Sequence, residues 1–335
     1  MATRIKPTPN SPQKIQLSRI SHVYLRHPDP EEFLAFAIDF GFVEEARVDG
    51  AIYLRGYGID PYCYVVLPSK NGEKEFEGGA YVVQSNNDLE KAMKLPGAVR
   101  KDISHLPGGG EIVSLSSPGG TKIHLVGEQG TRVAPVKEPS AQVMNLGPYN
   151  LPFNKERKGE FQRFQAGPAM VHKLGHYGYV SSKFDEDIAF YLDNFNITPT
   201  DILYEPTNSD LDVLTFLHID LGSDYSDHHT LFMQRGAPGQ ETKMHHCSFE
   251  VADFDTQLLG HQWLADKGYT SIWGVGRHIL GSQIFDYWKD PSGFKIEHYA
   301  DGDVVNEKTD TQRLEAGPDT LSIWGPPLPA SFTET

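Results

Sequence analysis

The sequence predicts an α+β fold with two duplicated domains, in which tandem βαβββ modules form cupped, barrel-like mixed sheets. Three observations lead to this prediction. A strand-like run followed by a helix-like run occurs twice, several strand-like runs follow each helix, and the two copies align at constant offsets. An internal repeat of this kind indicates that one structural unit occurs twice along the chain.

The first copy begins at residue 17 with a strand-like run. Asp29 and Pro30 then predict the start of a helix, because Asp caps free backbone N–H groups and Pro suits the first turn. Gly41 predicts the end of that helix. Further strands are expected near 51–55, 62–67, 80–84 and 111–125, and a second helix over 86–95.

The second copy repeats this order from a strand over 174–180 into a helix over 185–192. His22 aligns with His176 at an offset of 154 residues, and residues 117–124 align with 290–297 at an offset of 173. Further strands are expected near 212–220, 228–234, 245–251 and 282–299, and a second helix over 253–267.

The repeat and the Pro-rich segments divide the chain into five parts. We expect a disordered arm (1–16), an N-terminal structural module without metal (17–127), a linker (128–170), a C-terminal catalytic module (171–302) and a Pro-rich C-terminal tail (303–335). Pro residues prevent the tail from forming a long helix.

Composition excludes several classes of function. The formal net charge of −15 argues against nucleic acid or an anionic membrane surface as a partner. Two cysteines without a CxxC motif exclude a disulfide framework. The polar N-terminus lacks the apolar core of a secretory signal, and no apolar run reaches the length of a membrane span. A cytoplasmic location is therefore expected.

Strand alternation places two histidines and one carboxylate of the second copy where a metal could bind. His176 lies on its first strand, Glu297 on its last, and His246 on a middle strand. His246 is preferred to His245, because His245 shares a face with Cys247 and is expected in the core. Two histidines and a carboxylate form the ligand set of non-haem Fe(II), and the same ligands suit Mn(II).

The alternative interpretation is that this trio is accidental. The chain contains 14 histidines, and Glu297 could belong to a solvated strand face beside Lys295. The duplication favours the metal interpretation, because only the second copy keeps the full set. The equivalent positions of the first copy are His22, Gly79 and His124, so that module is expected to be structural and His22 a packed histidine.

With these residues, the sequence resembles the type I extradiol ring-cleavage dioxygenases of the vicinal oxygen chelate superfamily over about residues 17–300. The most specific part is the last motif of the family. It is matched here by Gly276-Arg277-His278, Phe285, Tyr287, Asp290-Pro291-Ser292-Gly293, Glu297 and Tyr299.

The resemblance implies metal ligation by His176, His246 and Glu297, with His278 and Tyr287 as further active-site residues. It also implies an active-site histidine before the second ligand, for which His228 is preferred and His229 is the alternative. The sequence departs from the family pattern at Gly178, where relatives often carry a polar side chain, and in an inserted loop over 234–240. Both departures concern the substrate pocket.

The function implied is Fe(II)-dependent extradiol cleavage, in which both atoms of O₂ enter a small catechol-type aromatic diol, in the catabolism of aromatic hydrocarbons. A homo-oligomer is expected. The alternatives are a metal-free module that sequesters aromatic molecules and a glyoxalase-like metal lyase. The lyase usually needs four protein ligands, which Gly79 argues against. The identity of the diol stays open, as does iron versus manganese.

Overall fold

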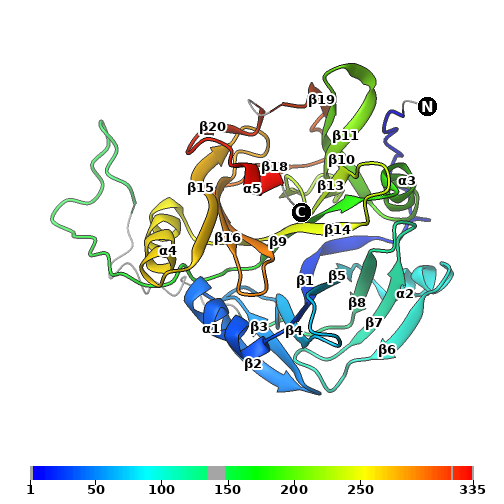
Figure 1. Cartoon of the computed structure of the whole chain (residues 1–335), viewed down its shortest axis with the longest axis horizontal. Coiled ribbons are helices and arrows are strands. Elements are labelled where there is room, and N and C mark those ends of the chain that lie inside the picture. Colours follow the sequence, from blue (N-terminus) through cyan, green and yellow to red (C-terminus); the bar gives the residue numbers. More distant parts are fainter. Residues whose placement is uncertain (1–2, 134–147, 318–319, 334–335) are drawn as a thin grey trace.

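The computed structural model describes residues 3–133, 148–317 and 320–333, and consists of two curled mixed sheets (Figure 1). The first sheet has the order β2-β3-β4-β1-β5-β8-β7-β6. Its strands are β1 (Leu17–His27), β2 (Val43–Val48), β3 (Ala51–Arg55), β4 (Tyr64–Pro68), β5 (Glu75–Val83), β6 (Val99–Asp102), β7 (Glu111–Ser116) and β8 (Lys122–Gly127).

The second sheet has the order β19-β10-β11-β13-β9-β14-β17-β16-β15-β20. Its strands are β9 (Leu174–Ser181), β10 (Ile197–Glu205), β11 (Asn208–Ile219), β13 (Leu231–Arg235), β14 (Lys243–Glu250), β15 (Thr270–His278), β16 (Ile284–Lys289), β17 (Lys295–Ala300), β19 (Gln312–Glu315) and β20 (Ser322–Trp324). A separate pair joins β12 (Ser226–Asp227) to β18 (Val304–Val305). The helices are α1 (Pro30–Phe40), α2 (Asn86–Ala92), α3 (Phe184–Asn194), α4 (Phe254–Asp266) and α5 (Ala330–Thr333).

Each module contains two βαβββ units, so the fold confirms the α+β prediction and shows a further duplication inside each copy. The first and last strands of each unit are parallel neighbours: β1 with β4, β5 with β8, β9 with β13, and β14 with β17. The two units of a module join through antiparallel pairs, β1 with β5 and β9 with β14. The centre of each sheet is therefore built from first strands.

Local sequence explains the boundaries of helix α1. The Asp29 side chain accepts hydrogen bonds from the N–H groups of Glu31 and Glu32, and Gly41 ends the helix with φ +113°. Any side chain at Gly41 would also collide with the backbone of Ala169, since a Cβ there would lie 1.8 Å from its carbonyl oxygen. The helix end thus packs directly against the segment that leads into the second module.

Aromatic contacts join the two modules. Phe40 of α1 stacks on His298 of β17 at 3.6 Å between ring centroids, and His298 Nε2 donates to the Phe40 carbonyl at 2.7 Å. His27 of β1 contacts Tyr64 and Ser292 through its two ring nitrogens, each at 2.8 Å. The turn that carries Ser292 is therefore held by the first module.

Both ends of the chain differ from the expectation. Residues 3–16 are not a free disordered arm. Ile15 is buried and bridges to Phe195, and the backbone N–H of Ile5 donates to Asp212. The Pro-rich tail supplies β18, β19, β20 and α5, because Pro prevents a long helix but not short strands.

Four strands inside the modules were also not anticipated from the sequence, namely β2, β6, β10 and β15. No described helix is long and apolar enough to cross a membrane.

Candidate metal centre and active-site pocket

Three potential ligands meet on one face of the second sheet. They are His176 on β9, His246 on β14 and Glu297 on β17, which are adjacent strands. Ser248 pairs with both His176 and Glu297, so these two side chains share a face with each other and with His246 two residues earlier. His176 Nε2 lies 3.0 Å from His246 Nε2 and 3.3 Å from Glu297 Oε2.

The polar atoms of this cluster fit a divalent metal ion. Glu297 is fully buried, and neither of its carboxylate oxygens has a hydrogen-bond partner of normal geometry among the described residues. An unpaired buried carboxylate costs several kcal/mol, which a bound cation offsets. Burial, with His245 and His176 close by, lowers the pKa of His246 well below 6.5. Its imidazole is therefore neutral, which is the form that binds metals.

A β-bulge explains why both neighbouring histidines reach the pocket. The pairing of β14 with β9 shifts between Met244 and His246, so the strict alternation used for the prediction does not hold there. His246 joins the ligand cluster as expected. His245 lines the cavity and packs against Phe232 and Phe332, so its assignment to the core is wrong.

The structure places His229 in the cavity wall, whereas the sequence favoured His228 for the active site. His229 lines the cavity, with its ring 4.0 Å from that of His176. His228 turns away, and its Nε2 lies 2.8 Å from the Asp201 carboxylate. These residues lie just before β13, where no regular alternation decides the direction of each side chain. Sequence analysis missed Asp201 altogether.

The three buried residues Asp201, His228 and His229 form a hydrogen-bonded chain. A carboxylate only accepts, so His228 Nε2–H donates to Asp201. In the single-proton tautomer of His228 this leaves Nδ1 bare, so that it accepts from His229 Nδ1–H at 3.1 Å. His229 keeps a free lone pair on Nε2. Burial, with His176 and His228 close by, lowers the pKa of His229 well below 6.5, so the ring is a neutral acceptor.

His278 and Tyr287 form a second hydrogen-bonded pair in the cavity wall. His278 Nδ1 donates to the Leu321 carbonyl at 2.7 Å, so its neutral Nε2 accepts from the Tyr287 hydroxyl at 3.0 Å. Burial and the charge of Glu297 raise the pKa of Tyr287 well above 10, so the phenol keeps its proton. His278 Nε2 lies 4.0 Å from Glu297 Oε1, which places the pair beside the ligand cluster.

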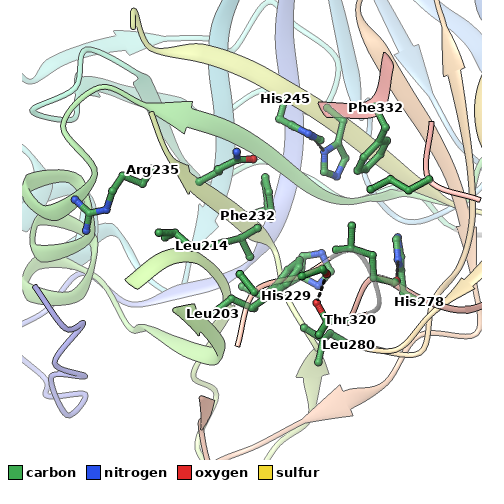
Figure 2. A pocket seen from close by; sticks show the side chains of 18 of the residues that line it. Leu203, Leu214, His229, Phe232, Arg235, His245, His278, Leu280, Thr320 and Phe332 are labelled. Atoms are coloured by element: carbon green, nitrogen blue, oxygen red, sulfur yellow. Dashed lines mark hydrogen bonds between the residues drawn. The ribbon is translucent and has the colours of Figure 1, made fainter. Parts of the chain in front are cut away.

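One cavity of about 510 Å³ is lined by His176, His246, His229, His278 and Tyr287, among others (Figure 2). His278, His245 and Phe332 lie toward one end and Arg235 at the other. Sequence analysis did not anticipate the contribution of the C-terminal segment, in which Leu321, Leu328 and Phe332 line the cavity. The tail forms no long helix among its described residues, but the short α5 places Phe332 against Tyr287 at 4.8 Å between ring centroids.

Among the described residues, the first module brings together no set of ligands like that of the second. The strand pairing places Gly78, not Gly79, at the position of His246, because Ala80 pairs with His22 and His124 as Ser248 pairs with His176 and Glu297. His124 bonds to Ser114 and to the Glu77 carbonyl. His22 is fully buried and packs against Tyr62, as a packed histidine would.

Comparison with known proteins shows what this chain is similar to. Residues 173–298 match the family model of the Glyoxalase/Bleomycin resistance protein/Dioxygenase superfamily. The match covers most of the C-terminal module and none of the N-terminal one.

Individual relatives narrow the resemblance. The chain is 30% identical to Metapyrocatechase 2 of Cupriavidus necator over 203 residues, which span 56% of this chain and 58% of that protein. The match thus covers little more than half of the relative.

Solved structures share the fold at lower identity. Homoprotocatechuate 2,3-dioxygenase from Arthrobacter globiformis has a TM-score of 0.74 at 17% identity, covering 99% of this chain and 95% of that one. The 2,3-dioxygenase LapB from Pseudomonas sp. KL28 has a TM-score of 0.72 at 20% identity, covering 90% and 98%. A Mn(II)-bound glyoxalase from Novosphingobium aromaticivorans has a TM-score of 0.74 at 18% identity, covering 94% and 93%.

Proposed function

We propose that this protein is an Fe(II)-dependent extradiol dioxygenase that opens the ring of a catechol-type diol beside its two hydroxyls. The observation that carries the proposal is the buried trio of His176, His246 and Glu297, whose carboxylate has no partner of normal geometry among the described residues. The 30% identity to a metapyrocatechase supports it.

His176, His246 and Glu297 would hold the metal, as the two-histidine, one-carboxylate set does for non-haem iron. When bound, Fe(II) supplies the electronic link between a chelated diol and O₂. Three protein ligands leave coordination positions free for both reactants. Mn(II) fits the same ligands, so iron is the proposal and manganese its alternative.

His229 is proposed as the acid–base residue, in place of His228. Its free Nε2 lone pair can accept a diol proton, because Nδ1–H is committed to His228. His228 and Asp201 then act as positioning residues, which hold the His229 ring in the tautomer that accepts.

Tyr287 and His278 are proposed to orient the diol. The Tyr287 oxygen keeps a lone pair after donating to His278, and this lone pair accepts a hydrogen bond from a substrate hydroxyl. Because Tyr287 stays protonated, it adds no charge beside Glu297. A diol that keeps one proton fits this arrangement.

The test is anaerobic loading of the purified protein with Fe(II), then catechol, then air. Ring cleavage of this type gives a yellow semialdehyde, measured by absorbance, and metal analysis gives the iron content. Yellow product from the iron-loaded protein, and none from the Glu297→Ala variant, is the expected result. A protein that binds no iron and cleaves none of a panel of catechols would instead favour a metal-free aromatic-binding module.

A further inference from the structure

The cavity extends far beyond the space that a single ring with two hydroxyls needs. Its volume of about 510 Å³ lies in the range of roughly 300–1,000 Å³ found for sites that hold drug-sized ligands. The ligand trio is beside His278 and Tyr287. Figure 2 shows Leu203, Leu214 and Arg235 away from His278, toward the other end.

Two aromatic rings mark where the polar end gives way to an apolar one. The Phe216 ring lies 4.9 Å from that of His229, and the Phe232 ring lies 5.6 Å from that of His246. Gly178 makes room for Phe232, because a Cβ at this position would lie only 2.4 Å from a ring carbon of Phe232. The departure from the family pattern at Gly178 therefore shapes the cavity.

An apolar part of the wall beyond these rings comes from two adjacent strands. It is formed by Leu203 of β10 and by Val213 and Leu214 of β11. Leu203 and Leu214 face each other in the strand register, so they form a continuous apolar surface. A ligand reaching this end contacts hydrocarbon side chains, which favours hydrocarbon on the ligand.

The positive charge of Arg235 at this end is already paired within the chain. Arg235 is the one Lys or Arg among the described lining residues, and its guanidinium makes two bonds of 2.6 Å to the Asp185 carboxylate. Glu205, also in the lining, is an acid. An anionic substituent would find no uncommitted Lys or Arg in this part of the described structure and would face a carboxylate.

We infer that the substrate is a catechol carrying an uncharged apolar substituent of about four carbons or more, which lies against Leu203, Val213 and Leu214. This inference rests on the proposed diol cleavage and adds the class of the substituent. The inferred substrate therefore differs from homoprotocatechuate, which carries a carboxylate and for which some structural relatives are named.

The expected selectivity follows from the burial of the substituent. Each buried methylene contributes about 0.8 kcal/mol, which is about a fourfold change in affinity. A butyl chain that is largely buried should therefore strengthen binding by about 100-fold relative to catechol.

Three probes test the inference on the Fe(II)-loaded protein: catechol, 4-butylcatechol and 4-(3,4-dihydroxyphenyl)butanoic acid, an anion of matched chain length. Anaerobic calorimetry gives Kd for each, and aerobic absorbance gives kcat/KM. We expect 4-butylcatechol to bind about 100-fold more tightly than catechol and the acid to lose most of that gain. Equal Kd values for catechol and 4-butylcatechol, or tighter binding of the acid, would overturn the inference.

A variant locates the substituent. Leu214→Trp fills the apolar end, so the preference for 4-butylcatechol over catechol should fall to about tenfold or less. Leu214→Ala should shift the preference to longer chains, and it serves if the larger side chain prevents folding. Ile38→Trp, on the exposed side of α1, should keep the wild-type preference.

The outcomes separate the two proposals. A protein that cleaves none of the diols contradicts the proposed function. A protein that cleaves catechol without preferring 4-butylcatechol contradicts only the inferred substituent, as does an unchanged preference in the two Leu214 variants.

Discussion

Replacing Asp201 by Asn tests whether the chain from Asp201 through His228 to His229 sets the proton-accepting tautomer. Asn has the shape of Asp, but its amide can donate to His228 Nε2 over the 2.8 Å that now separates the groups. His228 would then carry its proton on Nδ1 and donate to His229. The lone pair of His229 would then be on Nδ1. Its Nε2 would carry the proton and could no longer accept one.

The magnitude follows from what the tautomer controls. Acid–base catalysis by a positioned side chain is worth about 10²–10⁴-fold in rate. Asp201→Asn should therefore lower kcat by about 100-fold, and His229→Phe by at least as much. Because Asp201 and His229 act as a unit, the double variant should be about as slow as His229→Phe alone.

The assay is kcat for semialdehyde formation by iron-loaded protein, with iron content and anaerobic Kd measured on the same samples. Both should stay near wild type in Asp201→Asn, since neither ligand nor pocket residue is changed. His228→Phe is the contrast. It leaves the buried Asp201 carboxylate without its partner, so the free energy of unfolding should fall by about 3–5 kcal/mol, measured with urea.

Two results would refute this reasoning. A kcat within about threefold of wild type in Asp201→Asn would mean that the tautomer is not set by this chain. Wild-type kcat in His229→Phe would remove His229 from the mechanism altogether.

Three further changes should have distinct outcomes. Glu297→Gln should weaken Fe(II) binding by more than about 100-fold, measured by metal analysis after dialysis, and undiminished iron would contradict its role as a ligand. Burial lowers the pKa of His27 to about 3, so below pH 6.5 only the unfolded state gains this proton. His27 should thus remove about 2 kcal/mol of stability between pH 7 and 5, and urea unfolding of His27→Gln should show a correspondingly smaller pH dependence. Gly178→Ala should lower the free energy of unfolding by about 1–3 kcal/mol, because the Phe232 ring must move; unchanged stability would show that the ring shifts freely.

Features that depend on a repeat, a fixed spacing or strand periodicity could be predicted from the sequence. The constant offset between His22 and His176 indicated the duplication. Fixed spacing indicated the motif that contains His278, Tyr287 and Glu297. Strand periodicity placed His246 on one face with Ser248, which is where it meets His176 and Glu297.

Other features depended on chain segments that no local pattern connects. The direction of His229 was decided just outside a regular strand, and His245 reached the cavity through a bulge. Asp201 of β10 reaches His228 only through the tertiary fold, because no local sequence pattern connects these two residues. The C-terminal segment forms a wall of the cavity because its short strands find partners far away in the sequence.

The sequence by itself therefore determined the repeat and proposed the three ligands, because periodicity and spacing encode which face a strand residue occupies. The tertiary structure decided which histidine stands beside them and how large a cavity they face. Those properties arise from packing between elements distant in the chain, where bulges, turns and the C-terminal segment break the period on which sequence reasoning depends.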